Sequence, residues 1–169
     1  MEYKVEYSGR KTLSLCIKDG CLVVKAPHRT PGWVISDAVK KHESWINKNL
    51  QKQKERNDIY SSLTDEDIKK LRKLAKQILP AKVEHFANIM GLNYGRTTIT
   101  SAKTRFGSCS SKGNLAFSYL LLLYPEAAID YVVVHELAHL IEMNHSKNFY
   151  KIVESVLPDY KVRKKLLKK

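Results

Sequence analysis

The sequence is short of acidic residues. Only 17 Asp and Glu stand against 30 Lys and Arg in 169 residues, which gives a formal net charge of +13. This imbalance favours attraction to polyanions such as nucleic acid, nucleotides or acidic lipid. Net charge affects the rate of encounter with such partners and the solubility of the protein, but it does not identify a binding site. A solvated lysine-rich surface is the simpler interpretation, so an anionic partner stays an open alternative.

Cysteine and long apolar runs are also scarce. The three cysteines, Cys16, Cys21 and Cys109, are an odd number without paired metal-ligand spacing. We interpret them as reduced thiols of a cytoplasmic protein, with a Cys16–Cys21 bridge as the lesser alternative. No apolar run approaches the roughly 18 residues of a membrane span, and the N-terminus has no signal-peptide core, so we expect neither anchor nor leader.

The residues that are present indicate an α+β protein in two parts, 1–60 and 61–169. Alternating apolar residues between 3 and 26 predict strands, with a turn at Lys18-Asp19-Gly20. A helix is expected from Ser36 or Asp37 to about Lys54, with Ser36 as a plausible N-cap. The polar stretch 51–62 is interpreted as an exposed helix end and linker.

The second part begins with a capping-box pattern, Thr64-Asp-Glu-Asp67, which predicts the start of a helix. Pro80 is expected to kink or break that helix and Gly91 to end it, while its lysines and arginine between 69 and 76 form a solvated face. Short strands and turns follow in 97–118, with Gly107 and Gly113 serving tight turns.

A further helix is expected to begin at Pro125 and to reverse at Met143-Asn144. It carries His135-Glu-Leu-Ala-His139, in which two histidines four residues apart lie on one helix face. Both imidazoles can then bind one metal ion, and Glu136 is placed to act on a metal-bound water. Imidazole ligands with an open fourth position suit zinc best, so the motif predicts a zinc-dependent hydrolase.

The third ligand must come from a segment that turns back toward the histidines after the helix. In a straight helix, a residue ten positions after His135 would lie about 15 Å away along the axis. We favour His145, which follows the expected reversal. Glu142, Glu154 and Asp159 are the rival ligands. The donor that stabilises the developing oxyanion is left open among four residues, which are Arg105, Tyr124, Tyr131 and Tyr150.

Three segments stand out together: Arg105-Phe-Gly-Ser-Cys109 with the residues up to Leu115, Ile129 to His139, and Asn144 to Tyr150. They resemble the YgjP-like (DUF45) zinc metallopeptidase family, and the resemblance extends over nearly the full chain. It implies a zincin-like domain related to the SprT and WLM metallopeptidases, preceded by a small β-rich segment. By position, it implies His135, His139 and His145 as ligands of one Zn²⁺ and Glu136 as catalytic base.

The resemblance has limits and leaves roles open. Phe106 and Tyr150 stand where the family often has tryptophan, and Glu142 replaces the glycine of metzincins. Arg105 beside a zinc cleft could hold a substrate carboxylate or phosphate, or it could anchor a turn. Cys109 is interpreted as a small buried residue.

Three functions compete for this sequence. The first is a zinc peptidase whose peptide or protein substrate lies along an edge strand near residues 113 to 119. The implied relationship to SprT-like proteins, together with the net charge of +13, suggests nucleic-acid-associated proteins as one class of substrate. The second is a zinc-dependent nucleotide or phosphoester hydrolase, and the third is a non-catalytic nucleic-acid-binding module with a basic face. The substrate and the oligomeric state are not defined by the sequence.

Overall fold

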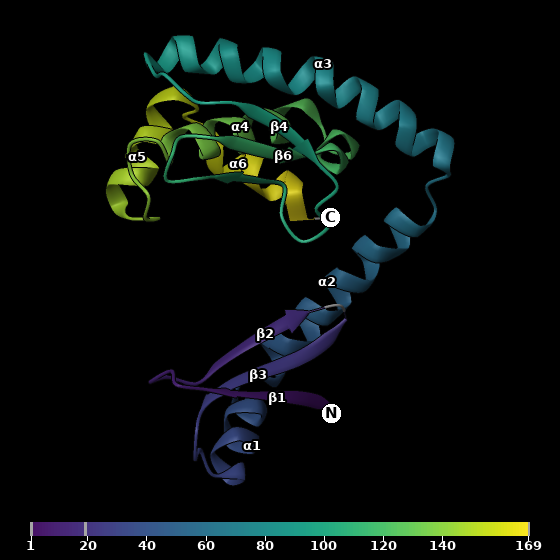
Figure 1. Cartoon of the computed structure of the whole chain (residues 1–169), viewed down its shortest axis with the longest axis vertical. Helices are drawn as coiled ribbons and strands as arrows, with labels where there is room; N and C mark the ends of the chain where they lie inside the picture. The colour runs from purple at the N-terminus through teal and green to yellow at the C-terminus, as the bar shows by residue number, and fades with distance from the viewer. Residues whose placement is uncertain (1, 19, 169) are drawn as a thin grey trace. The chain divides into compact units, whose positions relative to one another are not determined.

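A computed structural model describes residues 2–18 and 20–168, which divide into two units, one ending at Ser62 and the other beginning at Leu63 (Figure 1). Each unit combines helices with a three-stranded sheet that contains both parallel and antiparallel pairs. The α+β class expected from the sequence is therefore confirmed. Over the residues described, no helix is both long and apolar enough to cross a bilayer.

The sheet of the first unit is built on β3 (Cys21–Pro27), whose apolar residues are its most buried. β1 (Tyr3–Ser8) pairs with β3 in parallel and β2 (Ser14–Lys18) pairs with it antiparallel, in the order β1-β3-β2. Gly20 has a φ of 78°, which glycine adopts readily, while Asp19 of the predicted turn lies outside the described residues.

Two helices pack on this sheet where the sequence predicted one: α1 (Gly32–Lys41) and α2 (Glu43–Ser61). The predicted N-cap was wrong, because Ser36 lies inside α1 and its hydroxyl donates to the Gly32 carbonyl at 3.1 Å. α2 also continues through the stretch predicted to be a linker. The shared core contains six buried residues, which are Leu22, Val24, Ala26, Ile35, Val39 and Ile46.

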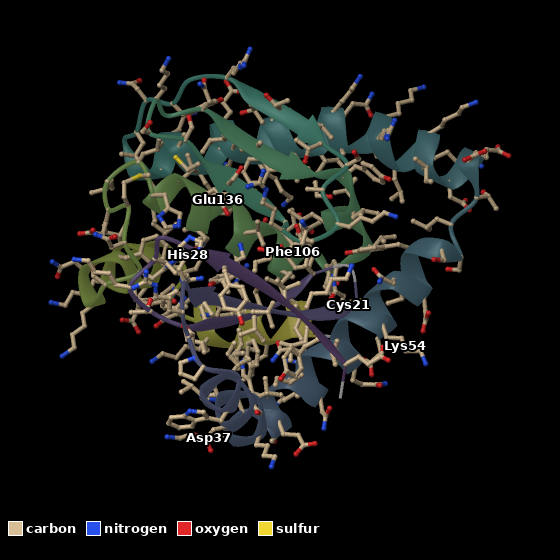
Figure 2. The ribbon with its side chains drawn as sticks, turned by 60° about the horizontal axis from the view of Figure 1, so that its bottom comes forward. Cys21, His28, Asp37, Lys54, Phe106 and Glu136 are labelled. Carbon is tan, nitrogen blue, oxygen red and sulfur yellow. The ribbon has the colours of Figure 1, made fainter. Side chains whose placement is uncertain are left out.

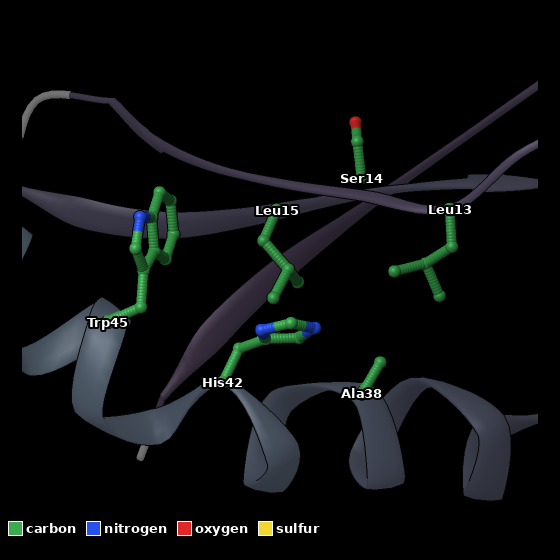
Figure 3. Close-up of a pocket in the computed structure, with 6 residues that line it drawn as sticks. All are labelled: Leu13, Ser14, Leu15, Ala38, His42 and Trp45. Carbon is green, nitrogen blue, oxygen red and sulfur yellow. The ribbon is translucent and has the colours of Figure 1, made fainter.

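An apolar pocket of about 380 Å³ opens between β2 and the helices of the first unit. Leu13 and Leu15 point toward the helices, and Ser14 points the opposite way (Figure 3). Ala38, His42 and Trp45 complete the lining. Trp45 is 46% exposed and lines this pocket.

The second unit starts with the long helix α3 (Asp65–Met90). Its capping box forms as predicted: the Thr64 hydroxyl accepts from the backbone N–H of Asp67, and the Asp67 carboxylate accepts from the N–H of Thr64. Gly91, with a φ of 63°, ends the helix. Of the kink or break predicted at Pro80, the break was wrong and the kink stays a prediction. α3 continues through Pro80 because proline removes one helical hydrogen bond, while fully buried Leu79 and Val83 hold both halves to the core.

The second sheet holds β4 (Thr97–Thr100), β5 (Gly107–Cys109) and β6 (Leu115–Ser118), in the order β4-β6-β5. β6 runs parallel to β4 and antiparallel to β5, so it is paired on both sides. The sequence expected an edge strand near residues 113 to 119, and that expectation was wrong. β5 is the edge that contacts α4 (Glu126–Ala138), and β4 is the edge that contacts α3.

α4 is the central helix of this unit and contacts α3, β5, α5 (Lys147–Val156) and α6 (Tyr160–Lys165). The short 3-10 helix η1 (Tyr119–Leu123) precedes α4, and η2 (Leu166–Lys168) follows α6. Lys82 of α3 donates to the carboxylates of Glu126 and Asp130 at 2.7 and 2.6 Å, and Arg163 of α6 also pairs with Asp130. These contacts hold α3 and α6 against the start of α4.

Candidate metal centre

The three histidines lie at the end of α4 and at the start of α5. α4 ends at Ala138 with His139 as its C-cap, five residues before the reversal that the sequence predicted at Met143-Asn144. The chain then turns, and the Ser146 side chain caps α5 by accepting from the N–H of Phe149. This earlier helix end gives the turn enough length to return His145 toward α4.

The three imidazoles converge. One ring nitrogen from each of His135, His139 and His145 lies within 4.8 Å of the others, and Nε2 of His145 is 3.0 Å from Nε2 of His135. In a tetrahedral zinc site with Zn–N bonds of about 2.0–2.1 Å, ligand nitrogens are about 3.3 Å apart. The spacing of His135 and His145 is within a few tenths of an ångström of this value, and the neutral imidazole donors of all three residues are of the type that Zn²⁺ prefers. The rival ligands Glu142, Glu154 and Asp159 are not part of this group.

Hydrogen bonds at Nδ1 orient two of the rings. Nδ1 of His139 lies 3.1 Å from the carbonyl oxygen of Glu142, which only accepts, so this nitrogen carries the proton and donates. Nδ1 of His135 lies 3.4 Å from the hydroxyl of Tyr131, one turn earlier on α4. Both contacts leave Nε2 as the nitrogen available to a metal ion, an arrangement typical of protein metal sites.

The ring of Phe149 forms the floor of the histidine group. It is fully buried, and its centroid lies 4.8, 4.5 and 4.9 Å from the rings of His135, His139 and His145. The sequence showed no sign of this role, because residue spacing along one helix does not show contacts with residues of another. Burial, together with the neighbouring imidazoles, lowers the pKa of His135 to about 3, so this ring is a neutral ligand at ordinary pH.

Glu136 is the buried carboxyl group of the site, with 7% of its surface exposed (Figure 2). Burial raises its pKa to about 7, and the positive charge of Arg105 opposes that rise. Gly107 of β5 packs directly on it: a Cβ at Gly107 would lie 2.6 Å from Cγ and 2.7 Å from Oε1 of Glu136. Gly107 was predicted to serve a turn, but it lies within a strand and provides space for this carboxylate.

The four candidate oxyanion donors differ in position. Tyr124 is buried and packs edge-on against Phe106, with ring centroids 4.9 Å apart, and Tyr131 contacts His135. The Tyr150 hydroxyl accepts from Lys164 at 3.4 Å, and its ring centroid is 6.4 Å from that of His145. Arg105 is exposed and forms no hydrogen bond or ion pair with the residues that the structure describes.

The thiol of Cys109 is a poor nucleophile. Burial raises its pKa, and the nearby charge of Glu136 raises it further. Its Sγ lies 3.5 Å from the carbonyl oxygen of the next residue, Ser110. The sequence indicated a small buried residue, and Cys109 is half-buried.

Comparison with known proteins identifies a family that matches this chain. The model of the YgjP-like metallopeptidase domain matches residues 11–69 and 65–169. The metallopeptidase zymogen abylysin of Pyrococcus abyssi is 26% identical with a TM-score of 0.49, over 53% of this chain and 91% of that one. The zymogen jannalysin of Methanocaldococcus jannaschii is 18% identical with a TM-score of 0.43, over 50% and 91%. No curated protein matches the chain in sequence.

Proposed function

The chain belongs to the YgjP-like metallopeptidase family, and from this premise we propose that it is a zinc-dependent peptidase with Glu136 as its general base. The observation that carries the proposal is the convergence of three imidazoles on one point beside a buried carboxyl group. We assign the hydrolase to residues 61–169 and an accessory role to residues 1–60.

In this proposal His135, His139 and His145 hold one Zn²⁺. When bound, the metal supplies a Lewis acid and lowers the pKa of water toward neutrality. Tyr131 and the Glu142 carbonyl keep Nε2 of His135 and of His139 directed at the metal. The ring of Phe149 prevents the three imidazoles from tilting away from one another.

Glu136 accepts a proton from the attacking water and delivers it to the amide nitrogen that leaves. Its burial removes competing solvent, and the close backbone of Gly107 limits the positions that its carboxylate can take. Arg105 is the candidate substrate contact, because its side chain is exposed, unpaired among the described residues and close enough to act on Glu136 electrostatically. Tyr150 is the second donor near the histidines.

We expect the polypeptide substrate to be extended and to lie along β5. This strand is an edge of the sheet, it contacts α4, and its residue Gly107 touches Glu136. An edge strand offers unpaired N–H and C=O groups that an added strand can use. This position replaces the one expected from the sequence on residues 113 to 119. A cytoplasmic location remains part of the proposal, in keeping with three free cysteines.

The test compares wild type with Glu136→Gln. The control is Glu142→Gln, which removes a carboxylate that lies outside the histidine group. We expect Glu136→Gln to keep its zinc and lose hydrolysis of an unfolded protein by at least about 1,000-fold, since the base and its charge are both removed. Glu142→Gln should keep both its zinc and its hydrolytic activity. Full activity of Glu136→Gln would refute the proposed role of Glu136.

Two further measurements separate the alternatives. His145→Ala should bind zinc far more weakly, and unchanged zinc content would remove His145 from the ligand set. Nucleoside triphosphates and phosphodiesters are assayed in parallel. Zinc-dependent turnover of these, without cleavage of unfolded protein, would establish the phosphoester hydrolase, and no turnover of any substrate would favour the nucleic-acid-binding module.

A further inference from the structure

The exposed side of α3 carries a stripe of positive charge. Lys69, Arg72, Lys73 and Lys76 follow one another at helical spacing, so they share one face of the helix. All four side chains are exposed, and none pairs with a carboxylate among the residues that the structure describes. Lys70, which lies off this stripe, is instead paired with Glu66 at 3.0 Å.

Two of these residues line a groove at the β4 edge of the second sheet. Arg72 and Lys76 form one wall of a cavity of about 390 Å³, and Ile99, Thr100, Ser101 and Tyr119 form the rest. The guanidinium of Arg72 lies over the ring of Tyr119, 5.1 Å from its centroid. Stacking fixes the guanidinium and leaves its in-plane N–H donors free for an acceptor in the groove.

The groove connects to the candidate metal centre through continuous structure. Thr100 also lines a smaller cavity of about 60 Å³, together with Arg105, Gly107 and residues of β6. Gly107 touches Glu136. The loop between β4 and β5, residues 101–106, adds the exposed cations Lys103 and Arg105 along the way. The two cavities therefore share Thr100, and the loop that joins β4 to β5 carries two exposed cations.

We propose that the groove of Arg72, Lys76, Thr100 and Ser101 binds acidic side chains of the polypeptide substrate, so that the enzyme prefers acidic segments. This inference rests on the proposed peptidase function. Two cations and two hydroxyl groups are suited to a carboxylate, and the charge complements an acidic chain extended from the cleft. Single-stranded nucleic acid fits less well, because Tyr119 is the one ring among the described residues that line the groove, and it is buried beneath the guanidinium of Arg72.

The experiment measures binding separately from cleavage. Two labelled peptides, identical except for a run of glutamates in one and glutamines in the other, are titrated against the full chain carrying Glu136→Gln. We expect the acidic peptide to bind about tenfold more tightly, with a preference that falls as salt increases. In Arg72→Gln/Lys76→Gln, made in the same background, the preference should fall to within about twofold. Lys70→Gln removes the same kind of charge from the same helix outside the groove, and it should keep the preference.

Cleavage of the same two peptides by wild type then links the groove to catalysis, since kcat/KM should show the same ratio. Equal binding of the peptides, or equal loss in Lys70→Gln, would overturn the groove as an acidic-peptide site. Tighter binding of an oligonucleotide that displaces the acidic peptide would assign the groove to nucleic acid and also overturn it. Peptide binding with the expected variant pattern, but no cleavage by wild type, would refute the peptidase and leave the acidic-peptide site standing.

Discussion

Gly107→Ala is a small substitution that should disable the site without touching a metal ligand. The added Cβ would lie 2.6 Å from Cγ of Glu136, whereas non-bonded carbons are comfortable at about 3.5–4.0 Å. Either β5 or the Glu136 side chain must therefore move by about 1 Å. Because Glu136 is 7% exposed and surrounded by packed atoms, the movement changes the direction of its carboxylate.

The magnitude follows from that displacement. Overpacking a buried position costs about 1–3 kcal/mol of unfolding free energy. A misplacement of about 1 Å in a catalytic group lowers the rate by about 100-fold, equivalent to about 2.7 kcal/mol of transition-state stabilisation. We therefore expect Gly107→Ala to fold, to bind zinc as wild type does, and to lose about two orders of magnitude in kcat/KM.

Gly113→Ala is the matched control from the same hairpin. Gly113 has a φ of 73°, so alanine there strains the backbone by about 1–2 kcal/mol. Its Cβ would meet Leu140 Cδ2 at 3.4 Å and the backbone nitrogen of Gly95 at 3.8 Å, both without a clash, and Glu136 is not among the atoms it approaches. The assay combines urea unfolding, zinc content and hydrolysis of a quenched unfolded protein. If Gly107→Ala retained activity within threefold of wild type, or if Gly113→Ala lost as much, the close packing of Gly107 on Glu136 would have no catalytic consequence.

Two further predictions concern hydrogen bonds. Tyr131→Phe removes the hydroxyl 3.4 Å from Nδ1 of His135, and zinc affinity in a chelator competition should fall at least about tenfold; unchanged affinity would contradict the orienting role. Thr64→Ala removes the N-cap of α3 and should cost about 1 kcal/mol in urea unfolding. Hydrogen bonds from the Thr64 hydroxyl and backbone N–H lower the pKa of Asp67 below 3.8, so their stabilisation is present above that pH and is lost as pH falls through the lower folded-state pKa. Asp67→Asn should flatten this acid dependence, and an unchanged pH profile would refute it.

Local chemistry explains what the sequence predicted correctly. The capping box at Thr64, the left-handed Gly91 and the four-residue spacing of His135 and His139 are determined by residues within one or two turns of each other. His145 required only that the chain reverse within a few residues. These features depend on backbone preference and helical period, which are both visible in a single sequence.

Long-range packing explains what the sequence did not predict. Pro80 is tolerated because Leu79 and Val83 are buried against other elements, and β6 is central because two distant strands pair with it. The contact between Gly107 and Glu136 joins residues 29 positions apart on a strand and a helix. No pattern of apolar residues specifies which strand lies at an edge or which glycine faces a carboxylate.

The position of Phe149 has a consequence for the order in which the candidate metal site is assembled. His145 and Phe149 both follow α4, so a nascent chain that has folded only as far as α4 has two histidines and no floor beneath them. Docking of α5 brings the third imidazole and the ring together, with Phe149 and Val153 fully buried. In the proposed peptidase, the third imidazole and the ring that packs beneath it are therefore supplied together when α5 docks on α4, and a chain that ends before His145 holds two of the three imidazoles.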